Sequence, residues 1–464
     1  MKKIFKITIV GALLFTKLLV VSAANFNYNG EMVFSSNIEV NGEAYISTEA
    51  GKSALVVSGG TSQMNACAIE KSGSSKSKSK EFEELGNNSA VVVYNGAILN
   101  FELGSIMTDA DYANGIFAYG MGEINVENAS INTILNNSAG IVAAEGAKIN
   151  ANGVVVETKG KYSPTIKSEK GAGKIEVNQG AYTSYEEGSA NIYSKGEVIV
   201  NNATLTSHKS SSIEIIGANS VSLDNVFLFN ENTSLQNVNN ILIHGIDNNE
   251  NPNGIAKFIS KNSNINIKKG DTIYVNNIKA DILLENNVFE NNDGNFLIIK
   301  KDNSSENNNE VDVKLRLFDQ DIDGNIEVGN NSSLDISIEN GSTLIGAINS
   351  KNDSKEIYLT LSEDSYLSLT ADTYVKELNN ENTTNRNIFS NGKYKLFVNG
   401  VQVEINSNKY ELLLLPETEV KEEKEIKNTS NIKVIALISS MITIIIIVLI
   451  LIKCRVNRKN ASND

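Results

Sequence analysis

One segment has the residue types and spacing of a calcium-binding loop. Asp319, Asp321 and Asp323 alternate along the chain, and Gly324 follows them. Alternate carboxylates before a glycine turn wrap a hard cation in EF-hand loops, which also need a bidentate acid at the twelfth position. Asn330 stands at that position. We therefore favour a polar turn, keep the three aspartates as the candidate Ca²⁺ ligands, and expect no other metal or cofactor.

Residues suited to polysaccharide cleavage are scarce. A lyase needs clustered acids for calcium and a basic proton acceptor, and a hydrolase needs paired carboxylates on one strand face. Before the second hydrophobic segment the chain holds two arginines and two histidines, Arg316, Arg386, His208 and His244. None of them recurs with the repeat described below beside paired acids. We expect no catalytic residues and no enzyme activity; a pectate-lyase-like enzyme is the alternative.

Residues 89–230 repeat one short pattern with a period near 25 residues. Apolar residues alternate within each copy, as in Ile124 and Val126, which is the period of a half-buried strand. Three columns of small or branched apolar residues run through the copies. The first column is Val92, Ala118, Ala143, Ile166, Ile192 and Ile215; the second is Leu99, Ile124, Ile149, Ile175, Val198 and Val221; the third is Ile106, Ile131, Val156, Tyr182, Leu205 and Leu228.

Each copy therefore predicts one coil of three short strands. A glycine follows the first strand of each copy, where a sharp corner needs backbone freedom. Stacked coils pair like strand with like in parallel sheets, and parallel crossovers are strongly right-handed. The sequence thus predicts an all-β protein, a right-handed parallel β-helix with three sheets. The corner glycines are Gly96, Gly120, Gly146, Gly171, Gly196 and Gly217.

Polar residues occupy one aligned position after the second strand. Amides stacked at the coil spacing can bond up and down a column, which predicts an internal Asn ladder; chance placement in an Asn-rich chain is the alternative. The residues are Asn128, Gln179, Asn202 and Asn225, with Gly153 interrupting them.

The first strands of the early coils predict an outward apolar strip. Phe117, Tyr119 and Tyr193 on this strip are the candidate partner residues, because exposed aromatic rings stack on sugars or anchor proteins. The absence of tryptophan favours a protein partner or self-association. The alternative is that residues 53–88, or a second rod, cover the strip. The positions expected to face outward are Val91, Val93, Phe117, Tyr119, Val142, Ala144, Asn191 and Tyr193.

Hydrophobic segments at both ends predict export and anchoring. Residues 1–23 combine early lysines, an apolar run and a small-residue end, as in a signal peptide, although a retained anchor is the alternative. Residues 434–452 carry no charge and are long enough for a transmembrane helix. Basic residues follow at 453–464, so that tail is expected in the cytoplasm. Between these ends we expect a cap or first coil at 24–52, the β-helix at 53–410 and an acidic stalk at 411–433.

The stalk contains a stretch that resembles the sorting signal of Gram-positive cell-wall proteins. Leu415, Pro416, Glu417 and Thr418 match that pattern, but Glu419 stands where cleavage requires glycine. The alternative is that the chain keeps its membrane helix. Either interpretation predicts a rod displayed at the cell surface.

Charge, cysteine content and one lysine-rich segment indicate which partners, covalent bonds and loops to expect. The formal net charge is −14, which disfavours nucleic acid as a partner. Cys67 is the only cysteine before the second hydrophobic segment, so we expect no disulfide and a small buried residue there. Lys71, Lys76, Lys78 and Lys80 alternate with serines and predict a solvated loop.

The repeated phrases SAVVV, GIFAYG, GIVAAEG and NATLT resemble those of secreted β-helix, adhesin-like surface proteins of gut Firmicutes, whose architecture is similar to pertactin-type rods. The resemblance covers roughly residues 53–404. It implies a membrane-anchored surface rod that binds a host, matrix or neighbouring-cell ligand, either protein or glycan. It brings no catalytic residues. A structural surface-layer protein is a further alternative.

Overall fold

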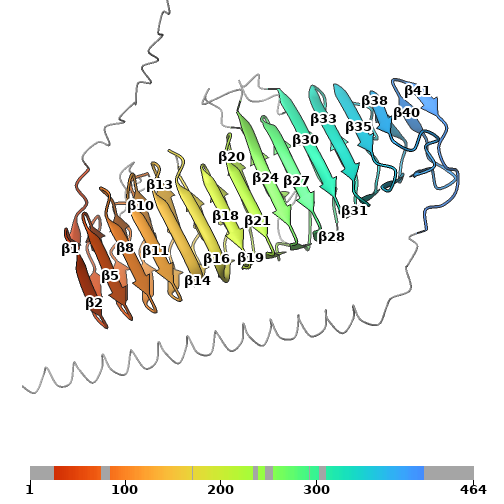
Figure 1. The fold of residues 1–464 in the computed structure, drawn as a ribbon. Coiled ribbons are helices and arrows are strands. Elements are labelled where there is room, and N and C mark those ends of the chain that lie inside the picture. The colour runs from red at the N-terminus through yellow and green to blue at the C-terminus, as the bar shows by residue number, and fades with distance from the viewer. Residues whose placement is uncertain are drawn as a thin grey trace, which may run out of the picture.

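The computed structural model describes residues 26–74, 84–169, 171–233, 239–245, 254–291, 293–301 and 310–411. These residues form an elongated parallel β-solenoid of about 13 turns and contain no helix (Figure 1). The expected all-β solenoid is confirmed. The segments expected to be a signal peptide, most of the stalk, a transmembrane helix and a cytoplasmic tail lie outside the described residues. Within the described residues, no helix is long and apolar enough to cross a membrane.

Each coil contributes one strand to each of three lines along the rod. Strands within a line pair in parallel. The first line is β1 (Gly30–Phe34), β4 (Ser53–Val57), β7 (Val91–Val93), β10 (Ile116–Tyr119), β13 (Ile141–Ala144), β15 (Ile166–Ser168), β17 (Ile192–Ser194), β20 (Ile213–Ile216), β23 (Asn239–His244), β26 (Asp271–Asn276), β29 (Leu297–Lys300) and β32 (Ile326–Val328).

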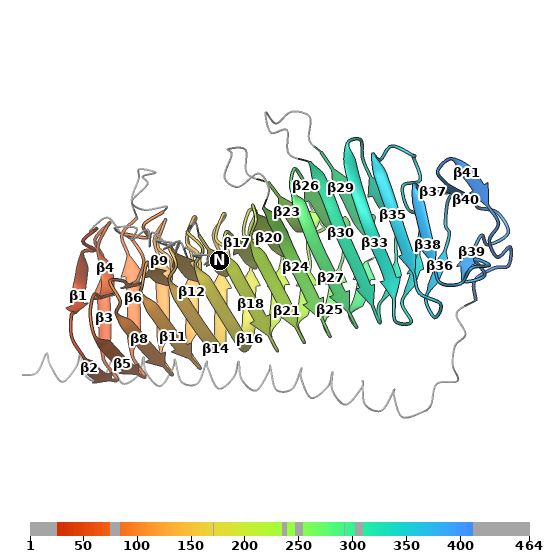
Figure 2. The same ribbon diagram turned by 45° about the horizontal axis from the view of Figure 1, so that its top comes forward.

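The second line is the longest and runs the length of the rod (Figure 2). It comprises β2 (Ile38–Asn41), β5 (Thr61–Asn65), β8 (Ile98–Glu102), β11 (Glu123–Glu127), β14 (Lys148–Thr158), β16 (Lys174–Ser184), β18 (Glu197–Asn201), β21 (Ser220–Asp224), β24 (Ile255–Lys261), β27 (Lys279–Glu285), β30 (Val311–Phe318), β33 (Ser332–Glu339), β35 (Glu356–Leu361) and β38 (Glu377–Asn380).

The third line shares β14 and β16 with the second, because these two strands continue through the corner between them. Its other strands are β3 (Ala44–Ser47), β6 (Ala68–Ser72), β9 (Ser105–Asp109), β12 (Ser130–Thr133), β19 (Thr204–Ser207), β22 (Phe227–Asn230), β25 (Asn264–Ile267) and β28 (Val288–Asn291), followed by a separate sheet of β31 (Asp321–Asp323), β34 (Thr343–Ile345), β36 (Tyr366–Ser368) and β39 (Ile388–Phe389).

An antiparallel hairpin closes the C-terminal end of the rod. β37 (Thr373–Val375) pairs in parallel with β40 (Leu396–Val398), and β40 then pairs antiparallel with β41 (Val401–Val403). Asn399 and Gly400 both take left-handed backbone angles in the turn between β40 and β41. Such two-residue turns match the twist of a hairpin.

The strand register decides which residues form the interior. The second and third predicted columns pair directly and are buried, for example Ile149 with Ile175 and Val156 with Tyr182. The first predicted column is wrong at three steps. Val92 pairs with Phe117 rather than with Ala118. Ala143 pairs with Ser168 rather than Ile166, and Ile192 pairs with Ile213 rather than Ile215, each a shift of two residues. The run of three valines in β7 shows no alternation, so no register could be predicted there from hydrophobic pattern.

Side-chain bonds do link neighbouring coils after the second strand, but the predicted ladder is not internal. Asn128, Gln179, Asn202 and Asn225 are exposed, and all four have positive φ angles. Their shared feature is therefore a left-handed corner, a conformation that Asn tolerates better than most residues. The internal ladder follows one position later and in later coils, through Val226, Ser263, Asn287, Gln320, Ser342 and Ser365.

Two of the corner glycines illustrate different steric demands. Gly171 has a φ of 89°, the left-handed angle expected for such a corner. Gly196 has no positive φ, but an added Cβ would lie 2.3 Å from the carbonyl oxygen of Gly173. Both positions therefore require glycine, one for its angle and the other for close contact between coils.

Lys71 lies inside the solenoid, in β6, and not in the predicted solvated loop. It is 1% exposed and pairs with Thr108 in the next coil. Its long side chain reaches a corner where only backbone carbonyls receive its ammonium group, as described below. The alternation of lysine with serine hid this position, because an interior lysine has no sequence signal of its own. Cys67, by contrast, is fully buried as expected.

Candidate ligand-binding groove

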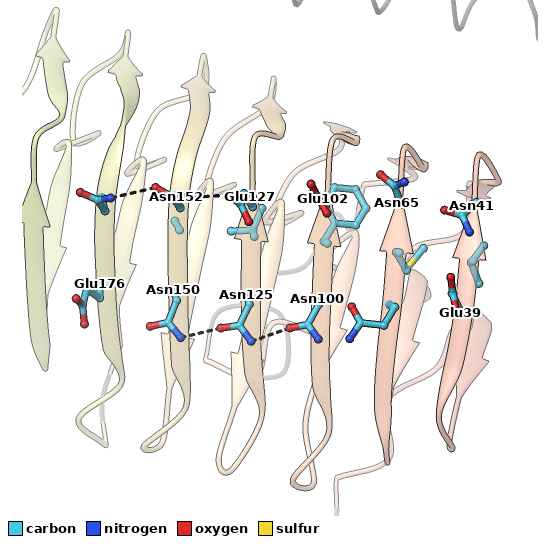
Figure 3. A pocket seen from close by; sticks show the side chains of 17 residues that line it. Glu39, Asn41, Asn65, Asn100, Glu102, Asn125, Glu127, Asn150, Asn152 and Glu176 are labelled. Carbon is cyan, nitrogen blue, oxygen red and sulfur yellow. Dashed lines mark hydrogen bonds between the residues drawn. The ribbon is translucent and has the colours of Figure 1, made fainter.

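A polar groove of about 840 Å³ runs across the outer face of the second line, from β2 to β16. Alternation in these strands points one set of side chains inward and leaves two rows facing the groove. Because the strands are in register, each coil adds one residue to each row (Figure 3). One row is Glu39, Gln63, Asn100, Asn125, Asn150 and Glu176; the other is Asn41, Asn65, Glu102, Glu127, Asn152 and Asn178.

Amide side chains in the first row bond to one another along the rod. The Nδ2 atom of Asn125 donates to Oδ1 of Asn100 at 2.8 Å, and Nδ2 of Asn150 donates to Oδ1 of Asn125 at 2.7 Å (Figure 3). Each of these donations uses one of the two amide hydrogens. Nδ2 of Asn125 also donates to Oε1 of Glu123 at 3.4 Å, whereas the second amide hydrogen of Asn150 and a carbonyl lone pair remain for a bound molecule. The ladder thus fixes the amides at the strand spacing of about 4.8 Å.

The second row mixes amides with carboxylates. Nδ2 of Asn152 donates to Oε1 of Glu127 at 3.2 Å, and Nδ2 of Asn178 donates to Oδ1 of Asn152 at 3.1 Å. Glu102 and Glu127 are exposed neighbours in adjacent strands. The residues lining the groove include no lysine, arginine or histidine. The groove therefore presents many hydrogen-bond acceptors and amide donors, but no cation for an acidic ligand.

The predicted partner strip is largely covered by the chain itself. Phe117 is fully buried on the outer face of β10, in a small cluster separate from the solenoid interior. Gly86 lies against its ring, since an added Cβ there would come within 2.4 Å of it. Tyr28 packs edge-on against Tyr94 and Tyr119, with centroid distances of 4.9 and 6.2 Å.

Phe117 is therefore not an exposed partner residue, and Tyr119 is only half-exposed. Residues 84–88 belong to the segment that the alternative interpretation placed over this strip, and residues 26–28 complete the cover. The expectation that Val91 and Val93 face outward is also wrong, because both lie in the interior cluster. Of the other positions, Asn191 is fully buried and its Nδ2 donates to the Tyr182 carbonyl oxygen at 3.0 Å.

Tyr193 lies in a charged cluster on the same sheet. The ammonium groups of Lys167 and Lys195 lie 5.7 and 5.3 Å from its ring centroid, in cation–π geometry. The same ammonium groups lie 2.6 and 3.3 Å from the carboxylate oxygens of Glu169. Burial alone would raise the pKa of Glu169, but the two lysines outweigh it and lower the pKa. The lysines are thus occupied by a partner within the chain.

Glu214 continues the outward row beyond Tyr193. It lies in β20 between Tyr193 and Leu242 of the neighbouring coils. Burial raises the pKa of its carboxyl to about 7. Glu214 is thus flanked by an aromatic neighbour on one side and an aliphatic neighbour on the other.

The three candidate calcium ligands do not converge on one point. Asp319 occupies a left-handed corner with a φ of 49°, and Asp321 and Asp323 are exposed in β31 on either side of buried Ile322. Among the described residues there is no group of three or more His, Cys, Asp or Glu that could hold a metal ion. His208 stacks on Tyr185 at 4.8 Å and is not among the residues that line the groove.

The sequence contains a signal for the groove that lies outside the three apolar columns. The polar residues beside the second column recur with the same period, in the phrases Asn-Phe-Glu, Asn-Val-Glu and Asn-Ala-Asn that begin at Asn100, Asn125 and Asn150. No protein-family model matches the chain, and no curated protein or solved structure is detectably similar to it.

Proposed function

We propose that this chain is a membrane-anchored surface rod of adhesin type that binds a neutral polysaccharide along its polar groove. The observation that carries the proposal is the pair of in-register rows of amides and carboxylates on β2 to β16. Amides both donate and accept, and carboxylates accept from paired hydroxyl groups. A sugar polymer offers such hydroxyls repeatedly along its length.

The charge of the groove determines which polysaccharides it can bind. Glu39, Glu102, Glu127 and Glu176 line the groove without any cationic side chain. An acidic polymer such as pectin would meet repulsion from these carboxylates. Because the groove lacks an exposed aromatic platform, each sugar contact is weak, and affinity must come from many contacts along one polymer. We therefore expect binding to long neutral chains and little binding to short oligosaccharides.

A binding test with the full chain would use neutral glucomannan or xylan, acidic pectin and cationic chitosan. We expect the neutral polymers to bind and pectin not to bind. Asn125→Ala removes the centre of the amide ladder and should weaken binding about threefold to tenfold, the range for one or two net hydrogen bonds. Asn132→Ala, on β12 of the same coil but on another face, is the matched control. Binding to pectin or chitosan alone, or equal effects of the two variants, would overturn the proposal.

One observation supports a polysaccharide-cleaving enzyme as a second candidate function: the acids Glu102 and Glu127 are adjacent. A lyase would also need a basic proton acceptor, and none lines the groove. Incubation of the full chain with each polymer distinguishes the two functions. Sustained release of reducing ends that Glu127→Gln abolishes would replace the binding proposal with a hydrolase.

A further inference from the structure

The first coil leaves the solenoid interior open at the N-terminal end of the rod. Met32 and Ile38 occupy inward register positions, paired with buried Leu55 and Ser62, yet they are 38% and 37% exposed. The outer residues Val33 and Ile46 are also exposed, at 49% and 43%. Exposed apolar side chains thus gather on this one coil. Terminal repeats of a solenoid normally present a polar outer surface.

The backbone of the first coil also has strand edges that pair with no neighbouring strand among the described residues. Among the described residues, β1, β2 and β3 each pair on one side only, with β4, β5 and β6. The opposite edge of each strand is free to pair with another strand. The C-terminal end differs, because the β40 and β41 hairpin lies there and Leu396 is fully buried (Figure 2).

The open edge lacks the usual protection against pairing. Free edges are commonly blunted by lysine, proline or a bulge. Residues 30–47 contain no lysine and no proline, and β1, β2 and β3 pair with their neighbours in continuous register without a bulge. The charged residues here are Glu31, Glu39 and Glu43, of which Glu31 is paired with Lys52 of the next coil at 2.5 Å.

The described path of the chain argues against a cap from the preceding segment. Phe26 packs on Tyr28, and Tyr28 packs on Tyr94 and Tyr119 in the coils of β7 and β10. The chain therefore reaches β1 from the side of the later coils, and the residues before Phe26 start away from the open end. The segment after residue 411 starts at the opposite end of the rod.

We propose that a second copy of this chain covers the open end, so that two rods join head to head with their edge strands antiparallel. A two-fold axis brings the same apolar side chains and the same free edges together, which gives a closed contact. The proposal does not depend on the polysaccharide groove. With the predicted anchor beyond the other end, the two rods would extend from facing membranes.

Electron microscopy of the purified full chain, with a gold label on a C-terminal tag, tests this arrangement. A single rod of about 13 turns is roughly 60 Å long at 4.8 Å per coil. We expect rods of about twice that length with a label at each far end. Labels at the middle, rods lying side by side, or single rods at micromolar concentration would each overturn the proposal.

Variants at the open end provide the quantitative test. The double change Met32→Lys and Ile38→Lys should raise the dissociation constant of the dimer at least tenfold, measured by sedimentation. Met121→Lys is the matched control, since Met121 is 78% exposed in mid-rod. If the double variant does not fold, Val33→Lys alone serves, because that side chain points away from the interior. Equal dimerisation of the folded variants and the control would contradict the proposal.

Discussion

The Nζ atom of Lys71 donates to the backbone oxygen of Glu49 across 2.8 Å, from inside the solenoid. It also donates to the backbone oxygens of Ser72 and Gly73. Burial lowers the pKa of this ammonium group to about 8, although the Glu49 carboxylate partly opposes the shift. These carbonyls keep a charged group tolerable in a place where most chains would put an apolar residue.

The lowered pKa of Lys71 makes stability depend on pH. The unfolded chain holds the proton up to its usual pKa of 10.5, whereas the folded chain releases it near 8. The free energy of unfolding should therefore rise between about pH 8 and 10.5, by about 1 to 3 kcal/mol. Urea unfolding of the wild type and of Lys71→Met across this range isolates the effect. A difference between the two proteins that does not change with pH would contradict it.

The raised pKa of Glu214 predicts that the unfolding free energy falls, rather than rises, as pH increases over a lower range. Its folded pKa of about 7 lies above its usual value of 4.5, so its contribution to stability is complete below pH 4.5 and is lost as pH rises through 7. Glu214→Gln should match the wild type at pH 4 and exceed its unfolding free energy by about 1 to 3 kcal/mol at pH 8. Urea unfolding at both pH values is the measurement. Glu176→Gln, at an exposed position, is the matched control.

Tyr182→Phe should stabilise the rod by about 1 kcal/mol. The Tyr182 ring is fully buried between Val156 and Leu205, and its hydroxyl makes no hydrogen bond. Removing an unsatisfied buried polar group recovers part of its desolvation cost. Thermal melting measures the gain, with Tyr182→Leu as a control that also removes ring volume. A loss of stability in the phenylalanine variant would show that the hydroxyl has a bonding partner.

Adjacent residues in β16 should respond in opposite ways to a changed charge. Ile175→Asp places an unpaired carboxylate inside stacked coils and should cost about 3 to 5 kcal/mol. Glu176→Lys changes an exposed groove residue and should alter stability by less than about 0.5 kcal/mol. Thermal melting of both variants is the measurement. Equal effects would show the inward and outward assignment to be wrong.

Phe117→Ser should destabilise the monomer by about 3 to 5 kcal/mol, because the ring is fully buried beneath Gly86. Tyr119→Ser should cost less, since that ring is only partly covered. Thermal melting with a parallel cell-binding assay distinguishes structural from partner roles. If Phe117→Ser melts at the wild-type temperature but no longer supports cell binding, the ring would be an exposed partner residue and not a buried one.

Periodicity predicted the solenoid well, because each coil buries the same two columns against its neighbours. The Leu99 to Val221 column could be aligned from sequence, since branched apolar residues alternate there with polar ones. The first line could not be aligned, because Val92 and Phe117 are apolar on the outer face as well. Their cover comes from Tyr28 and Gly86, residues distant in sequence, and no local pattern specifies such a contact.

The candidate site was missed for a related reason. Asn100, Asn125 and Asn150 lie on the outward face of their strands, where polar residues are expected in any half-buried sheet, so their recurrence alone does not predict a groove. Lys71 shows the converse error. Its serine-rich surroundings predicted a solvated loop, whereas the side chain lies inside the solenoid. In both cases the decisive information is which face of the strand a residue occupies, and this depends on register across coils.

The fixed register also determines how the rod could change in length. A duplicated coil would insert one more member into each interior column and each groove row, about 4.8 Å further along. Neither the open tip nor the C-terminal hairpin would be altered. In the function proposed above, reach from the membrane and the number of sugar contacts would then increase together in equal steps, so that capture distance and avidity would be coupled by the geometry of a single repeat.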